Sequence, residues 1–186
     1  MQAIQTPSEE ERFQKNAVIL GSLVQKCVMD LNKAGYNSIN PFIVSMATTL
    51  LASFDKSYLI QGFIENSHKL CWDQIKKRDE HFFTENAADV FKALPMERVN
   101  LFKDLFLTHD ASGKSIVPQV SKDQMWDIFD ALIKISIKYI HRDRQPYCQE
   151  IDGKIVKLYH ASFFDEIDLV YHADLWKVKL EFPLNY

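Results

Sequence analysis

The feature that most constrains this chain is a long apolar segment from about Lys122 to His141. Its apolar side chains recur every three or four residues in two adjacent rows, which is the helical period. The rows are Met125, Ile128, Leu132, Ile135 and Tyr139, and Trp126, Phe129, Ile133, Ile137 and Ile140. Only a narrow polar stripe lies opposite: Asp127, Asp130, Lys134, Lys138 and His141. An apolar arc this wide predicts a helix that packs on two or more neighbours, at the centre of a bundle.

Two earlier helices are predicted from their start signals. Ser8 followed by Glu11 forms a capping box, which predicts a helix as far as about residue 33. Asn40 before Pro41 combines a capping side chain with proline at the first helical position. The helix predicted there, over 41–54, is apolar on nearly every side, and we therefore expect it to be buried.

Further helices follow from the same kinds of signal. Asp55 is expected to cap a helix over 56–78, Thr84 or Asn86 to open a short one through residue 91, and Pro95 one through 107. Gly113 and Pro118 indicate a loop over 108–120. Ser121 with Gln124 predicts a second capping box, at the start of the central helix.

The apolar pattern changes from helical to alternating after Arg144. Asp152-Gly153 is typical of a tight hairpin turn between strands over 147–151 and 154–160. Further strands are predicted over 168–172 and 175–182. The fold class predicted is therefore mainly α, a multi-helix bundle around the helix at about 122–142, with a short antiparallel β hairpin at the C-terminus. We expect residues 1–144 to form the bundle and 145–186 a β-rich extension packed on the same domain.

Composition bears on localisation. Cys27, Cys71 and Cys148 are widely separated and odd in number, which argues against a disulfide framework. The first residues are polar and acidic, unlike a secretory signal, and the longest apolar run, about 14 residues, is shorter than a membrane span. These patterns predict a soluble intracellular protein in a reducing compartment, the cytoplasm or nucleus. Only five of the 22 basic residues are arginine, a bias also typical of AT-rich genomes such as those of some viruses, which would place it in a host cell.

Possible metal ligands are sparse in the sequence. His68 and Cys71 lie three residues apart on a predicted helix and would share a face. A zinc site needs closely spaced ligand pairs, and only this one pair occurs. Further ligands would come from distant positions: His81, Cys148, His160 or His172. A buried thiol beside an imidazole is the simpler interpretation, so no metal or cofactor is assigned.

Two short phrases resemble functional motifs. His141-Arg142-Asp143 resembles the catalytic loop of protein kinases, but Cys148 occupies the position of its metal-binding Asn, and no glycine-rich loop or DFG occurs. Asp110 begins a phrase similar to a calcium loop, but Gly113 comes too early for that geometry and a simple turn is favoured. Carboxylates such as Glu80, Asp165, Glu166 and Asp168 carry no mark of burial, and no catalytic residue is assigned.

These observations favour a non-enzymatic protein that binds other proteins, as a scaffold or assembly subunit. Self-association through the C-terminal strands is one expected mode, because strand edges pair with other chains. The first alternative is a nucleic-acid-associated protein that uses lysine-rich helix faces: Lys76, Lys77 and Arg78, or Lys134, Lys138, Arg142 and Arg144. The net charge of −3 provides no general basic field for this. The second alternative is an enzyme or metal protein with an unrecognised site.

Overall fold

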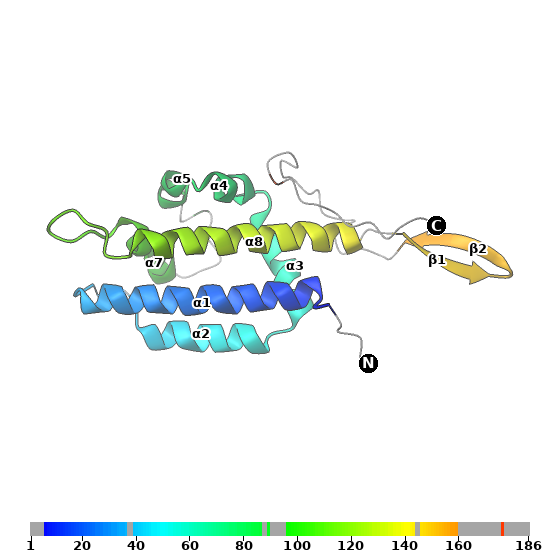
Figure 1. Ribbon diagram of the computed structural model, residues 1–186, viewed down its shortest axis with the longest axis horizontal. Helices are drawn as coiled ribbons and strands as arrows, with labels where there is room; N and C mark the ends of the chain where they lie inside the picture. Colours follow the sequence, from blue (N-terminus) through cyan, green and yellow to red (C-terminus); the bar gives the residue numbers. More distant parts are fainter. Residues whose placement is uncertain are drawn as a thin grey trace.

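The computed structural model describes residues 6–36, 39–86, 89, 96–143, 146–159 and 176. In chain order its elements are α1 (Glu9–Lys33), α2 (Pro41–Ser53), α3 (Lys56–Ser67), α4 (Trp72–Lys77), α5 (Glu80–Glu85), α7 (Met96–Leu107), α8 (Gln119–Asp143), β1 (Pro146–Ile151) and β2 (Lys154–Tyr159). The predicted mainly α class with one antiparallel hairpin is confirmed (Figure 1).

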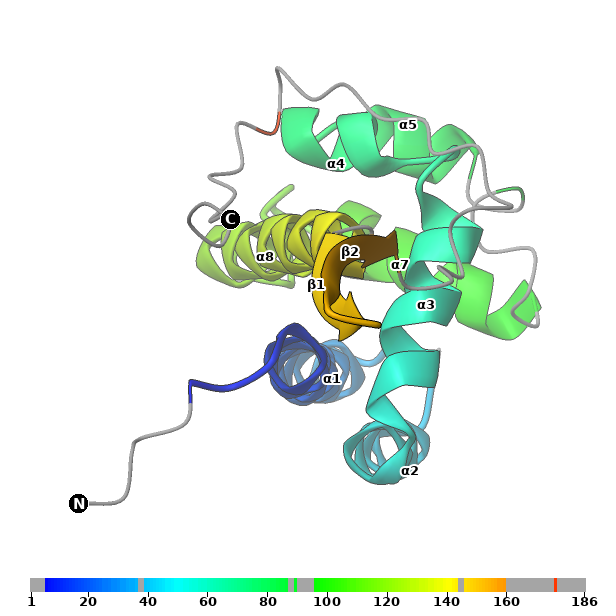
Figure 2. The same ribbon diagram turned by 90° about the vertical axis from the view of Figure 1, so that its right-hand side faces the viewer.

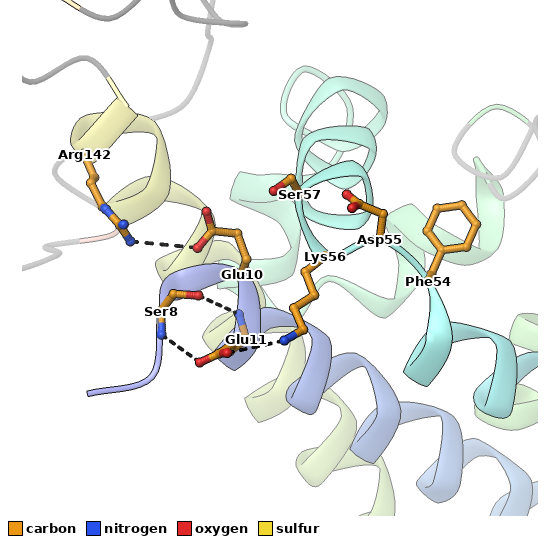
Figure 3. Close-up of a pocket in the computed structure, with 8 residues that line it drawn as sticks. All are labelled: Ser8, Glu10, Glu11, Phe54, Asp55, Lys56, Ser57 and Arg142. Atoms are coloured by element: carbon orange, nitrogen blue, oxygen red, sulfur yellow. Dashed lines mark hydrogen bonds and ion pairs between the residues drawn. The ribbon is translucent and has the colours of Figure 1, made fainter. Parts of the chain in front are cut away.

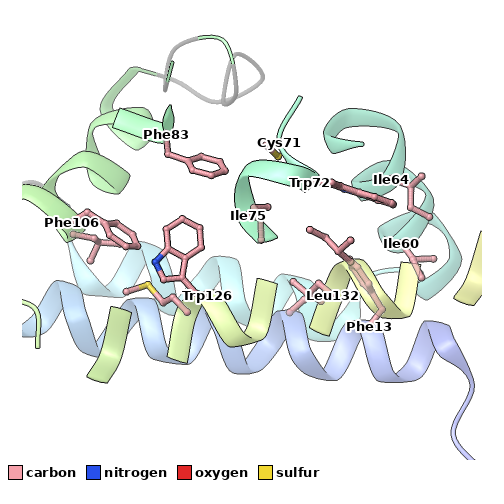
Figure 4. Packing of buried hydrophobic residues seen from close by; sticks show 14 of the residues in the cluster. Phe13, Ile60, Ile64, Cys71, Trp72, Ile75, Phe83, Phe106, Trp126 and Leu132 are labelled. Atoms are coloured by element: carbon pink, nitrogen blue, oxygen red, sulfur yellow. The ribbon is translucent and has the colours of Figure 1, made fainter. Parts of the chain in front are cut away.

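The long helix α8 runs through the middle of the bundle. α1 lies along one side of it, and α4 and α5 cover the opposite side (Figures 1 and 2). Side chains of both predicted apolar rows are buried. They are Met125 and Leu132 in the first row, and Trp126, Ile133 and Ile137 in the second. Around Trp126 the rings of Phe83 and Phe106 lie 5.6 and 5.4 Å away, between centroids (Figure 4). The predicted central helix is therefore confirmed.

The start of α8 differs from the prediction. The helix begins at Gln119, directly after Pro118, and the backbone N–H groups of Ser121 and Lys122 both donate to the Pro118 carbonyl, at 2.9 and 3.2 Å. Ser121 is thus inside the first turn, and its side chain is buried rather than free to cap. The predicted capping box at this residue is wrong because the helix begins three residues earlier than a cap at Ser121 implies.

A buried lysine joins α8 to α7. Lys122 is only 4% exposed, and its Nζ donates to the Phe106 carbonyl at 2.8 Å, near the C-terminal end of α7. The same ammonium lies 5.6 Å from the centroid of the Phe106 ring. A cation at this position satisfies a terminal carbonyl and meets the negative end of the helix dipole.

The single helix predicted over 56–78 is interrupted. α3 ends at Ser67, and α4 begins at Trp72 after an irregular turn. The Trp72 indole N–H donates to the Ser67 hydroxyl at 2.8 Å, so the break turns this large ring into the core, where it is 1% exposed. Local periodicity gave no sign of the break, because the apolar spacing continues through it.

The short helix α5 was not predicted. It is capped by Asp79, whose carboxylate accepts from the Phe82 backbone N–H at 2.9 Å, and Asn86 is its C-terminal cap. Most of the helix predicted to open at Thr84 or Asn86 and run to residue 91 lies outside the described residues, and residue 89 within that range is helical. The helix predicted after Pro95 is confirmed as α7.

The predicted hairpin is confirmed, with Ile151 paired to Lys154 across the turn. Asp152 and Gly153 have φ angles of 52° and 74°, the left-handed values that a two-residue turn of this kind requires. The hairpin extends beyond the C-terminal end of α8 (Figure 1). The two further strand predictions lie outside the described residues, except for Trp176, which is helical rather than extended, contrary to the prediction. Trp176 is buried, and the Lys76 ammonium lies 5.0 Å from its ring centroid.

Candidate functional site

The helix α2 is not buried, contrary to the prediction. It lies along the outer side of α1, away from α8 (Figures 1 and 2), and none of its residues is buried. Among the described residues only α1 packs extensively against it. One neighbour covers one side of a helix, so the apolar side chains on the other side of α2 remain in solvent.

Four side chains define this exposed side, hereafter the α2 face: Phe42, Ile43, Met46 and Leu50. They follow helical spacing, opposite Val44, Thr48 and Leu51, which face α1. Phe42 is 67% exposed and Leu50 is 63% exposed. Two more exposed aromatic side chains follow closely in the chain, Phe54 and Tyr58. The four side chains of the α2 face together expose on the order of 400 Å² of apolar surface, as large as the largest apolar patch on a typical monomer.

Both ends of α2 are tied down by side-chain hydrogen bonds. At the start, the Asn40 side chain accepts from the Phe42 backbone N–H at 2.9 Å. At the end, Gln14 of α1 donates from Nε2 to the carbonyls of Leu51, Ala52 and Phe54, at 2.9, 3.2 and 3.0 Å. Gln14 thus supplies a C-terminal cap from a distant part of the chain. The α2 face is therefore presented by a fixed helix.

The contact between α1 and α2 is close at one point and open beside it. A Cβ atom added to Gly21 would lie 3.0 Å from Thr48 Cγ2, so glycine is needed for this approach. Next to it is an apolar groove of about 330 Å³, lined from four helices by residues such as Phe13, Leu20 and Phe129. The only polar side chain in its lining, Thr48, donates its hydroxyl hydrogen to the Val44 carbonyl at 2.8 Å.

The segment of the chain that contains α2 carries no charged residue. From Ala34 to Phe54 no residue is charged. The first charges after it are occupied: Asp55 caps α3 by accepting from the Tyr58 backbone N–H at 2.9 Å, and Lys56 contacts Glu11 at 3.3 Å. The α2 face is thus apolar and uncharged, with charges only beyond the end of the helix.

A polar hollow of about 480 Å³ lies at the N-terminal ends of α1 and α3 (Figure 3). Its polar groups serve structural roles. Ser8 and Glu11 complete the predicted capping box, each bond being 3.2 Å long. Hydrogen bonding with Ser8 and then Lys56 lowers the pKa of Glu11. These bonds cap α1 and join its start to the start of α3.

Arg142, in the phrase similar to a kinase loop, belongs to the last turn of α8. Its guanidinium contacts Glu9 at 2.6 Å and Glu10 at 3.8 Å, and the hydrogen bond with Glu9 is the main reason that the pKa of Arg142 is raised. The residue joins the end of α8 to the start of α1. This contact favours a structural role over a catalytic one.

The His68–Cys71 pair is buried at the break between α3 and α4. The Cys71 thiol donates to the Ser67 carbonyl at 3.6 Å, and burial raises its pKa to about 12. In this environment the thiol is protonated at neutral pH, which is typical of a buried structural cysteine. Among the residues that the structure describes, no three His, Cys, Asp or Glu side chains are grouped so as to hold a metal ion. His160 and His172 lie outside that part of the chain, as do Asp165, Glu166 and Asp168.

Several cations of the predicted basic faces lie beside carboxylates. The pairs are Lys76–Asp130 (2.8 Å), Lys134–Asp130 (2.6 Å), Arg78–Asp127 and Arg142–Glu9 (2.6 Å). Burial acts to raise the pKa of Asp130, but hydrogen bonds from Lys134 and Lys76 outweigh it, and the pKa is lowered. Cations held in this way offer less charge to a phosphate backbone. Arg144 lies outside the described residues.

The loop between α7 and α8 contains the phrase similar to a calcium loop. One Asp110 oxygen, Oδ1, accepts from the Ser112 backbone N–H, the Ser112 hydroxyl and the Lys114 backbone N–H, at 2.8, 2.6 and 3.0 Å. These bonds, the one with the Ser112 hydroxyl first, lower the pKa of Asp110. The carboxylate therefore organises a turn, as its sequence favours.

Comparison with known proteins gives no indication of function. No protein-family model, curated protein or solved structure matches the chain. Within the described residues, none of the helices combines the length and apolar character needed to cross a bilayer.

Proposed function

We propose that this chain is a non-enzymatic protein that binds other proteins, as an assembly or scaffold subunit, and that it does so through the α2 face. The observation that carries the proposal is the exposure of Phe42, Ile43, Met46 and Leu50 on one side of a single helix. Contiguous apolar patches of this size mark interaction sites more often than ordinary surface. An exposed apolar helix face is also a common element of protein recognition.

The way in which α2 is held supports the proposal. Caps at both ends and the close contact at Gly21 fix the helix before any partner arrives. A fixed helix loses little conformational freedom on binding, and binding is stronger for that reason. In the polar hollow at the start of α1, Glu11 pairs with Lys56 and Arg142 pairs with Glu9, so these charges already have partners within the chain.

Site-specific photocrosslinking in extract of the source cells tests the proposal. A photoreactive amino acid replaces Leu50 in one variant and Val120 in a second, which is a matched control because the two residues are 63% and 62% exposed. We expect a discrete protein adduct at position 50 and none at position 120. The adduct is identified by mass, and its partner, once purified, should lose binding to Leu50→Glu. Equal labelling at both positions, or none at position 50, would overturn the proposal.

A further inference from the structure

We draw no further inference here: the strongest candidate, the apolar groove of about 330 Å³ that α1, α2, α3 and α8 line, would suit many apolar molecules, and nothing in the structure shows what fills it.

Discussion

Helices α2 and α8 are both rich in apolar residues, yet α8 is buried in the bundle and α2 lies at the surface. α8 carries charged residues throughout its length, including Asp123, Asp127 and Lys134, and still buries two rows of side chains. α2 has no charged residue, and yet none of its residues is buried. The difference is in the number of neighbours, since α8 is packed from several sides and α2 essentially from one. Burial therefore depends on what surrounds a helix as well as on its own apolar content.

The same substitution in both helices separates a buried position from an exposed one. Leu132→Ala in α8 removes a side chain that is 3% exposed and should lower the free energy of unfolding by about 3 kcal/mol. Leu50→Ala in α2 should change it by less than about 0.5 kcal/mol. Urea unfolding measures both. Equal losses would mean that α2 is packed as tightly as α8.

A second change probes the closest approach between α1 and α2. Gly21→Ala places a methyl group against Thr48 and should cost about 1–2 kcal/mol, although alanine is the better helix former. Adding Thr48→Ala should recover most of that loss in thermal or urea unfolding.

The matched control for this change is Gly62→Ala in α3, where nothing lies within 4 Å of an added Cβ. This variant should be more stable than the wild type by up to about 1 kcal/mol. A destabilised Gly62→Ala, or a neutral Gly21→Ala, would contradict the close α1–α2 contact.

The smallest expected effect concerns the polar side of α8. Asp130 bridges Lys76 of α4 and Lys134 of α8, and its pKa is lowered in the fold. Its ionised form therefore stabilises the fold at neutral pH, and this contribution of about 1 kcal/mol is lost as the pH falls from about 4 through the lower folded pKa. Asp130→Asn should lose it at neutral pH and show a flatter acid limb in unfolding experiments. Parallel pH profiles for the two proteins would exclude this role.

Local signals in the sequence predicted much of the fold. The capping box at Ser8, the Asn40 cap and the Asp55 cap all start helices where expected, and the Asp152-Gly153 turn forms the hairpin. Each of these signals acts within a few residues, so the sequence displays it directly. The cap predicted at Ser121 was wrong because α8 begins directly after Pro118, whose carbonyl accepts from the Ser121 and Lys122 backbone N–H groups.

The α2 face was not predicted, and no pattern in its own residues would have revealed it. An uncharged apolar helix has the same residue pattern whether it is enclosed by the fold or lies at the surface. The one additional signal was the lack of charge from residue 34 to 54, which suits a buried helix and a binding surface equally.

Where most helices begin, the central position of α8 and the hairpin turn were predictable from the sequence, because these depend on side chains close together in the chain. The surface position of α2, its cap by Gln14 and the break of the predicted long helix before Trp72 became visible only in the folded chain. These features depend on segments that meet only after folding. Gln14 lies 37 residues from Leu51, a separation at which no local pattern reports a contact.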